Sequence, residues 1–392
     1  MKAGKLFTSV CLLLVLALVL GSCGPAATPQ AVEVTKIVEQ KVEVTKVVQQ
    51  EVQVMVTPTP APPNPYRPDN LFEIADKLKA ALAGKAAPEG TRLALVANIL
   101  VPFWTACNIG GSRASAELNV PMIFYAPVKQ GDLAAQVSMM ESLVADDYSG
   151  ISFSAISPKA VEDIVAKGAA KGTNFITMDS DSPDSERYIY VGMQNYTAGV
   201  AAGEAAKQII GKGKVMGLVG FATAQNAIER IQGIKDALKG SDIEYIDTLY
   251  DDADPTKALS NAETTLTTYP DLAGFITIYS YDGPAAGQAV KAAGKTGTVK
   301  IVAFDLEPET QKLMNEGVIQ AAIGQRVYFY GYLSMYTLYA MSALGPEATM
   351  TILDPYLSGP KKDILDTGVD VVYGDQLQLY KDYLDSIGIA SQ

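Results

Sequence analysis

Histidine is absent from all 392 residues, and its absence excludes several kinds of catalytic and metal site. Ser-His-Asp and Cys-His catalysis both need an imidazole base, and histidine-ligated zinc or haem is excluded for the same reason. The absence of histidine does not exclude catalysis by carboxylates or lysine. Cysteine is also scarce, occurring only at Cys11, Cys23 and Cys107. Because Cys11 lies in an apolar leader, the exported chain cannot build an internal disulfide framework.

Positive charge is limited as well. The sequence has 31 Lys and Arg residues against 43 Asp and Glu, a net charge of −12, and no basic block stands out. We therefore expect neither nucleic acid nor an anionic membrane surface as a partner, because both attract clustered positive charge. The apolar fraction of 48% is ordinary for a globular protein, and the length allows two domains.

Residues 1–22 predict an export signal. Lys2 and Lys5 precede an apolar run at 6–20, which has the length of a signal h-region and is short for a membrane span. A leucine and two small residues then precede Cys23, a pattern that resembles the bacterial lipoprotein signal. The resemblance implies cleavage before Cys23 and lipidation of that residue; an ordinary signal peptide or anchor helix is the alternative. Acyl chains hold a protein to a membrane surface without spanning it.

Residues 23–66 are interpreted as the lipidated N-terminus and an extended stalk. A ten-residue repeat, VEVTKIVEQK at 32–41 and VEVTKVVQQE at 42–51, is followed by a proline-rich run at 57–65. Proline favours a stiff, extended linker. The β-branched repeat could instead pair as strands or coil with another chain.

Residues 67–90 predict a linker that contains one helix. Apolar residues recur at helical spacing over 69–84, Asp69 or Asn70 can cap the first turn, and Gly84 ends the helix. The helix could form the end of the stalk or pack on the domain that follows.

From Arg92 onward, short apolar runs alternate with helical stretches, which predicts parallel sheets with helices on both faces. The alternation runs through two successive series. We therefore predict an α/β fold of two Rossmann-like lobes, with the ligand between facing strand ends. The expected strands are 93–98, 121–126, 150–156 and 175–178 in the first lobe, and 214–220, 243–250, 274–279, 299–304 and 320–324 in the second.

One stretch, 175–195, organises the rest of the chain. The expected strand at 175–178 stops abruptly at Asp179, within a Ser/Asp/Pro cluster. In an open α/β sheet, ligands bind at the loops that follow the carboxyl ends of strands. We therefore predict that Asp179 is a ligand carboxylate and that the chain crosses between the lobes near Asn195. A loop of solvated acids is the alternative.

Several phrases carry a family resemblance. They are LVANILVPFW at 95–104, ITMDSDSPDSERYIYVGMQNYTAG at 176–199, VKIVAFD at 299–305 and IQAAIGQ at 319–325. Together they resemble the ribose/galactose-type periplasmic sugar-binding proteins that feed ABC transporters, over about residues 92–350. Regulators of the lactose-repressor type share these lobes, but they begin with a helix-turn-helix, whereas this chain begins with a signal and a stalk.

The resemblance implies a ligand cleft between two lobes and a hinge that closes the lobes over the ligand. The chain would cross between the lobes near Asn195, near Gln325 and around residue 350. The C-terminal stretch would add a strand and a final helix. The implied lobes are 91–194 plus 326–352, and 195–325 plus 353–392 with the tail.

Carried over position by position, the resemblance implies aromatic, acidic and amide contacts to a sugar. Phe103 and Trp104 would lie against the sugar ring, whose C–H groups stack on aromatic faces. Asp179 and Asp305 would each accept hydroxyl hydrogens from facing strand ends. Gln325, beside the hinge, would both donate and accept.

The chain departs from the ribose-binding pattern at two polar positions. One directly follows Asp179, and the other lies in the segment after residue 225. Ser180 stands where that pattern has an arginine, so one strong donor is missing. The arginine that usually reaches the sugar aligns with Ile228, which leaves Asn226 or Arg230 as substitutes. Asn226 could simply cap a helix, and Arg230 could be a solvated helix charge.

Two further departures concern the size of the sugar. Tyr281 precedes Asp282 where the family has Asn-Asp, and Val101 stands where the family has an asparagine, with Asn98 the nearest polar group. These changes argue against ribose itself. The aromatic surface that Trp104 and Tyr281 add favours an aldohexose in pyranose form, such as glucose or galactose.

The sequence thus predicts an extracytoplasmic solute-binding protein that captures a monosaccharide and delivers it to an ABC transporter permease. We expect a monomer without cofactor or metal, held to the cell membrane by its lipid anchor alone, in the periplasm or on the outer face. The same fold could instead bind a pentose, polyol, furanone signal or nucleoside. A glycoside hydrolase that uses Asp179 and Asp305 as paired acids is the enzymatic alternative.

Overall fold

The computed structural model describes residues 34–38, 50–54, 64–129, 131–222 and 224–389. The chain divides into two units, Met1–Pro63 and Asn64–Gln392. In the first unit, β1 (Val34–Val38) pairs antiparallel with β2 (Gln50–Val54). The repeat therefore pairs as strands, which is one of the alternatives that its sequence leaves open. The export signal, Cys23 and most of the proline-rich run lie outside the described residues.

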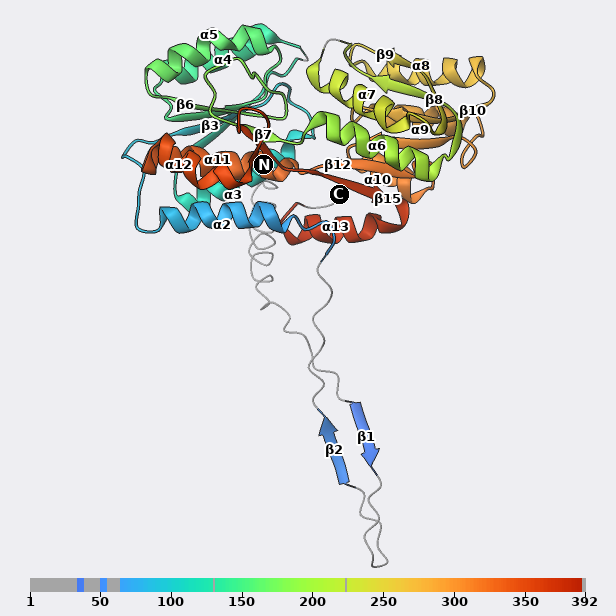
Figure 1. The fold of residues 1–392 in the computed structure, drawn as a ribbon, viewed down its shortest axis with the longest axis horizontal. Coiled ribbons are helices and arrows are strands. Elements are labelled where there is room, and N and C mark those ends of the chain that lie inside the picture. Colours follow the sequence, from blue (N-terminus) through green and yellow to red (C-terminus); the bar gives the residue numbers. More distant parts are fainter. Residues whose placement is uncertain (1–33, 39–49, 55–63, 130, 223, 390–392) are drawn as a thin grey trace, which may run out of the picture. The chain divides into compact units, whose positions relative to one another are not determined.

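In the second unit, the N-terminal lobe contains a seven-stranded sheet of order β13-β14-β7-β6-β5-β3-β4, parallel except for β13 (Figure 1). Its central strands are buried along their whole length, as expected for a parallel sheet covered on both faces. The strands are β3 (Leu93–Val96), β4 (Met122–Tyr125), β5 (Gly150–Phe153), β6 (Asn174–Met178), β7 (Tyr190–Gly192), β13 (Leu357–Ser358) and β14 (Ile364–Asp366).

Helices cover both faces of this sheet. On one face, α4 (Leu133–Ala145) and α5 (Pro158–Ala170) enclose a core of their own; on the other lie α3 (Trp104–Leu118), α11 (Val327–Leu344) and α12 (Pro346–Leu353) (Figure 1). The backbones of α3 and α11 touch, because a Cβ atom at Gly110 would lie 2.1 Å from the carbonyl oxygen of Tyr328. This close approach holds α3, whose first residue is Trp104, against α11.

The C-terminal lobe contains a six-stranded sheet of order β15-β12-β11-β10-β8-β9, in which only β15 is antiparallel to its neighbour. Two α/β lobes with mostly parallel sheets confirm the predicted fold class. The strands are β8 (Lys212–Val219), β9 (Asp242–Tyr250), β10 (Leu272–Thr277), β11 (Lys300–Phe304), β12 (Ala321–Gln325) and β15 (Val369–Tyr373); the helices are α6 (Asn195–Ile209), α7 (Gln225–Leu238), α8 (Pro255–Thr268), α9 (Asp282–Ala292) and α10 (Pro308–Asn315).

The chain crosses between the lobes three times. The first crossing joins β7 to α6 and the second joins β12 to α11, as predicted near Asn195 and Gln325. The third joins β14 to β15 at 366–369, so the prediction of a crossing around residue 350 is wrong. After α12 the chain returns to the N-terminal sheet, where β14 pairs parallel with β7. Residues 357–366 therefore belong to the N-terminal lobe.

The linker helix, α2 (Asp69–Leu82), packs on the domain. Its buried face carries Leu71 and Leu78, and the ring of Phe72 meets that of Phe329 edge-on at 5.2 Å. The predicted cap is wrong: Pro68 is the capping residue and makes no side-chain bond, while the carboxylate of Asp69 pairs with Arg67.

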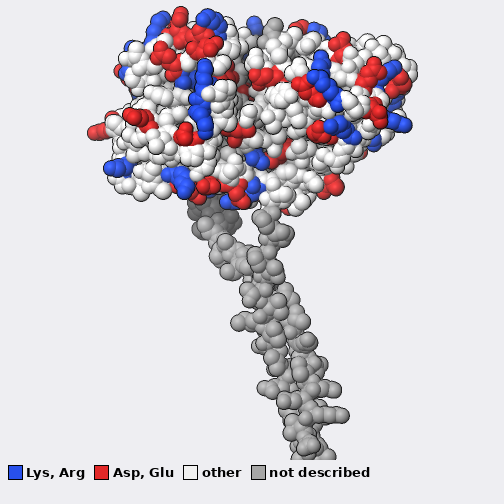
Figure 2. Space-filling view, in the orientation of Figure 1, with Lys and Arg blue, Asp and Glu red and all other residues white. Residues whose placement is uncertain are grey.

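The C-terminal stretch forms β15 and α13 (Leu377–Ser386), which confirms the predicted strand and final helix. None of the helices in the described part of the chain is long and apolar enough to span a membrane. Figure 2 shows Lys and Arg side chains scattered among Asp and Glu over the visible face of the lobes.

Candidate functional site

Asp179 and Asp305 occupy equivalent places in the two lobes. Asp179 follows β6 and Asp305 follows β11, and both have left-handed backbone, with φ of 58° and 66°. This conformation is uncommon for residues other than glycine, and Asp and Asn tolerate it best. Both side chains are 7% exposed. Each lobe thus places one buried carboxylate at the carboxyl end of a central strand.

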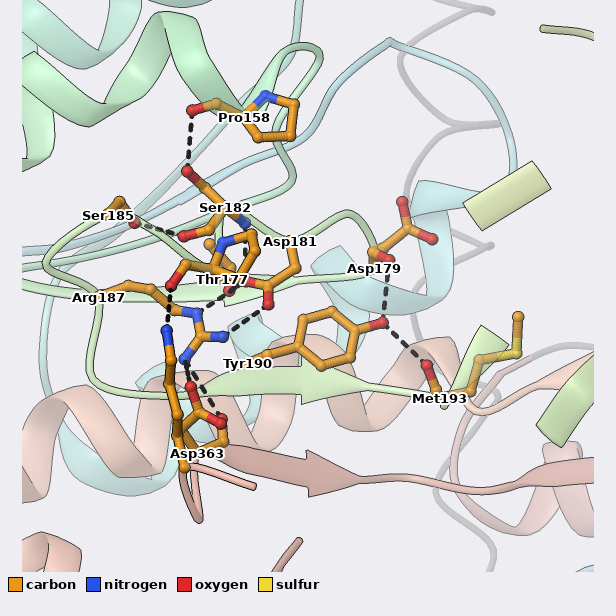
Figure 3. A network of polar contacts seen from close by, with 12 residues as sticks. Pro158, Thr177, Asp179, Asp181, Ser182, Ser185, Arg187, Tyr190, Met193 and Asp363 are labelled. Carbon is orange, nitrogen blue, oxygen red and sulfur yellow. Dashed lines mark hydrogen bonds and ion pairs between the residues drawn. The ribbon is translucent and has the colours of Figure 1, made fainter. Parts of the chain in front are cut away.

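Asp179 is held by its neighbours in the N-terminal lobe. Its Oδ2 accepts a hydrogen bond from the hydroxyl of Ser154 at 3.0 Å. The hydroxyl of Tyr190 lies 2.9 Å from the carbonyl oxygen of Asp179 and 3.0 Å from that of Met193 (Figure 3). Burial raises the pKa of Asp179, while the charge of Arg230 and the bond from Ser154 oppose that shift.

Asp305 belongs to a hydrogen-bonded chain that reaches across the second crossing. Its Oδ1 accepts from Nε2 of Gln325 at 2.8 Å, and Oε1 of Gln325 accepts from the hydroxyl of Tyr330 at 3.1 Å. Gln325 ends β12 in one lobe, whereas Tyr330 lies on α11 in the other. Burial raises the pKa of Asp305 to about 7, against the opposing effects of Arg230 and Gln325.

Arg230 supplies the buried positive charge of the site. It is 2% exposed, so it is not the solvated helix charge that the sequence allowed. Its Nε donates to Oδ1 of Asn195 at 3.0 Å, its Nη1 donates to the carbonyl of Ile278 at 3.1 Å, and its guanidinium lies 4.9 Å from the ring centroid of Phe304. Its charge favours the ionised forms of both Asp179 and Asp305. The structure thus brings these three groups and Gln325 together.

The two predicted aromatic contacts differ in exposure. Trp104 is 2% exposed, and its indole N–H donates to Oδ1 of Asn98 at 3.1 Å. Phe103 is half-buried and meets Trp104 edge-on at 5.2 Å. Phe103 therefore offers the accessible ring, while Trp104 and Asn98 satisfy each other. Contact of either ring with a ligand stays a prediction.

Ser180 and Asn226 are half-buried at the carboxyl edges of the two sheets. The carbonyl oxygen of Ser180 accepts from the backbone N–H of Ala155 at 3.0 Å. Asn226 does not cap α7, whose capping residue makes no side-chain bond; its Oδ1 accepts from the hydroxyl of Tyr279 at 3.1 Å. Their hydrogen bonding to a ligand stays a prediction.

Tyr281 and Asp282 form a separate cluster with Asp251. The hydroxyl of Tyr281 donates to Oδ1 of Asp251 at 2.7 Å, and Oδ2 of Asp282 accepts from the backbone N–H of Tyr279 at 3.1 Å. Burial and the neighbouring Asp251 raise the pKa of Asp282 well above its usual value. Within the described part of the chain, these hydrogen bonds of Tyr281 and Asp282 do not reach Asp179, Arg230 or Asp305.

A cavity of about 380 Å³ lies between the lobes and is lined by Phe103, Asp305 and Gln325. The other eight predicted site residues do not line it. Its remaining walls come from the starts of α3, α10 and α11 and from the C-terminal helix α13. Among the described residues, no group of three or more Cys, Asp and Glu is placed to hold a metal ion.

A buried ion-pair network, absent from the sequence-based predictions, fixes the loop that carries Asp179 (Figure 3). The side chain of Arg187 is 3% exposed; its Nη2 pairs with Oδ2 of Asp181 at 2.6 Å, and its Nη1 pairs with Oδ2 of Asp363 at 2.8 Å. Oδ1 of Asp181 also accepts from the backbone N–H of Ser182 at 2.7 Å. The loop is therefore tied to the segment before β14, rather than being a loop of solvated acids.

Sequence reasoning also missed Ser154, Tyr190, Asn195 and Tyr330 as partners of the site. Ser154 follows β5, which neighbours β6, so its strand-end position was a usable signal. Tyr330 lies in an almost wholly buried helix, so its sequence context contains no signal that marks it as a partner of the site.

Comparison with known proteins agrees with this fold. A family model described as a periplasmic binding protein domain matches residues 95–346. The chain is 28% identical over 234 residues to the D-allose-binding periplasmic protein of Escherichia coli (strain K12), covering 57% of this chain and 75% of that protein. It is 26% identical over 261 residues to the ribose import binding protein RbsB of Haemophilus influenzae, covering 66% and 88%.

Solved structures give the same result. An ABC transporter solute-binding protein from Burkholderia graminis, in complex with D-arabinose, is similar with a TM-score of 0.66 and 31% identity, covering 74% of this chain and 96% of that chain. A sugar-binding protein of a sugar ABC transporter from Bacillus halodurans has a TM-score of 0.64 and 26% identity, covering 74% and 99%. All four are binding proteins by name and none is named as an enzyme; three of them are named for import or for an ABC transporter.

Proposed function

This chain belongs to the periplasmic binding protein domain family, and on that premise we propose that it captures a monosaccharide between its lobes and delivers it to an ABC transporter permease. The observation that carries the proposal is the buried group of Asp179, Arg230 and Asp305, with Gln325 beside them. Carboxylates accept from hydroxyls, and a guanidinium and an amide donate to sugar oxygens.

The electrostatics of Asp305 support a hydroxyl-rich ligand. Burial raises its pKa to about 7, so its ionised form is less favoured in the protein than in water. Sugar hydroxyls would supply charge-assisted hydrogen bonds to the same carboxylate. A hydroxyl-rich ligand would therefore favour the ionised form of Asp305.

The identity of the sugar is the finer part of the proposal. We favour an aldohexose in pyranose form, such as glucose or galactose, because Phe103 presents a half-buried ring on which a pyranose face can stack. The relatives named above bind ribose, allose and arabinose. A pentose, polyol, furanone signal or nucleoside is the alternative, which a ligand panel separates.

We further propose that the mature protein is an extracytoplasmic monomer, lipidated at Cys23 and held to the membrane by its acyl chains alone. The family is extracytoplasmic, and the leader with its cysteine supports the anchor. The hydrolase alternative is not proposed, since the chain belongs to a family of binding proteins.

A thermal-shift panel of aldohexoses, pentoses, polyols and nucleosides tests the function, using the chain without its first 23 residues. A micromolar binder at millimolar concentration stabilises the folded state by about 4 kcal/mol. We expect a large shift with one hexose. If no sugar shifts the unfolding temperature, even after unfolding and refolding to remove any bound ligand, the proposal is wrong.

A further inference from the structure

The cavity between the lobes extends beyond the residues that a monosaccharide needs. Asp305, Gln325 and Phe103 form its inner wall, and these are residues to which the proposed function assigns sugar contacts. From there it continues beneath the C-terminal helix α13, which closes the far side. Its volume of about 380 Å³ falls in the range of about 300–1,000 Å³ that is usual for drug-sized ligands.

The far wall is mostly apolar. Tyr383 and Leu384 line it from α13, Ile387 lines it directly after that helix, and Ala106 and Ile109 line it from α3. Tyr383 and Ile387 are already buried, whereas Leu384, Ala106 and Ile109 are half-buried. A free sugar bound to Asp305 would leave these three partly against water, and an apolar group attached to the sugar would cover them.

Two charged residues of that wall, Arg326 and Asp370, pair with each other. Nη2 of Arg326 pairs with Oδ1 of Asp370 at 2.7 Å, and Nη1 of Arg326 donates to the carbonyl of Thr367 at 2.9 Å. They therefore form a structural pair at the third crossing and do not call for a charged ligand.

Two other wall residues each keep one acceptor without a donor. Oε1 of Glu307 and Oε1 of Gln311 are buried and have no hydrogen-bond partner. Gln311 is 5% exposed, and its Nε2 is used by the carbonyl of Leu306 at 2.6 Å. Both oxygens are closed off from the cavity, so they do not select a polar group on the ligand.

We propose that the cavity beneath α13 binds the aglycone of a glycoside, so that the preferred ligand is a sugar carrying an aromatic group. The sugar lies against Asp305, Gln325 and Phe103, and the aromatic ring lies against the apolar far wall. This inference rests on the proposed sugar-binding function and narrows its ligand class.

Calorimetric titration with free glucose and galactose, and with their phenyl α- and β-glycosides, tests the inference. We expect at least one phenyl glycoside to bind about tenfold or more tightly than its free sugar, as burial of an aromatic ring predicts. Ala106→Phe, which fills the cavity, should remove this advantage and leave the affinity for the free sugar within about twofold.

Ala116→Phe is the matched control, because Ala116 is exposed on the same helix and should keep the advantage. If Ala106→Phe does not fold, Leu384→Trp narrows the cavity from the opposite wall. Free sugars that bind as tightly as every glycoside would overturn the inference and leave the proposed function standing. If neither sugars nor glycosides bind, both are wrong.

Discussion

At the scale of single residues, ligand binding and stability make opposite demands on Asp305. Burial raises its pKa to about 7, so the folded, unliganded protein keeps a proton that the unfolded chain releases near pH 4. Since the unfolded state then binds fewer protons, the free energy of unfolding falls as the pH rises from about 4 to about 7. The same carboxylate is the acceptor proposed for sugar hydroxyls.

Asp305→Asn should therefore change stability in a pH-dependent way. Relative to the parent, the ligand-free variant should gain up to about 4 kcal/mol in free energy of unfolding between pH 4 and pH 7. Urea unfolding at both pH values measures this difference. A difference that does not change with pH would contradict the assigned protonation of Asp305.

The two neighbouring aromatic residues should separate stability from binding. Trp104→Ala empties a buried site and should cost about 3–5 kcal/mol of unfolding free energy. Phe103→Ala alters a half-buried ring and should chiefly weaken sugar binding, by roughly tenfold. Unfolding and ligand titration of both variants check these two expectations. A larger loss of stability in Phe103→Ala than in Trp104→Ala would contradict them.

At the scale of elements, sequence reasoning predicted what depends on local pattern. Apolar runs that end in polar loops located β6 with Asp179 and β11 with Asp305. It failed where pairing is long-range: β14 has three residues, and only its pairing with β7 reveals the position of the third crossing. The left-handed backbone of Asp179 and the burial of Arg187 likewise depend on tertiary contacts that no local pattern encodes.

The network of Arg187, Asp181 and Asp363 should be important for the stability of the N-terminal lobe. Arg187→Met leaves two partly buried carboxylates without their partner and should cost about 3 kcal/mol of unfolding free energy. Lys159→Met, which breaks an exposed pair with Glu162, is the control and should change stability little. Equal losses of unfolding free energy in the two variants would show that the buried network stabilises the protein no more than an exposed ion pair does.

At the scale of the whole molecule, a two-lobed binding domain follows a leader that predicts lipidation. Cys23→Ser should release the mature protein from the membrane fraction and leave its sugar affinity unchanged, because the anchor and the cleft lie in different units of the chain. Cell fractionation with a parallel titration checks both outcomes. A variant that stays in the membrane fraction would contradict the anchor.

The central claim is that one ligand is held between Asp179 of one lobe and Asp305 of the other. The most direct measurement is calorimetric affinity for the sugar identified in the panel, with Asp179→Asn, Asp305→Asn and the exposed control Asp163→Asn. We predict that each site variant weakens binding by about 2 kcal/mol, roughly 30-fold, and that the control binds like the parent. Parent-like affinity in both site variants would place the ligand elsewhere.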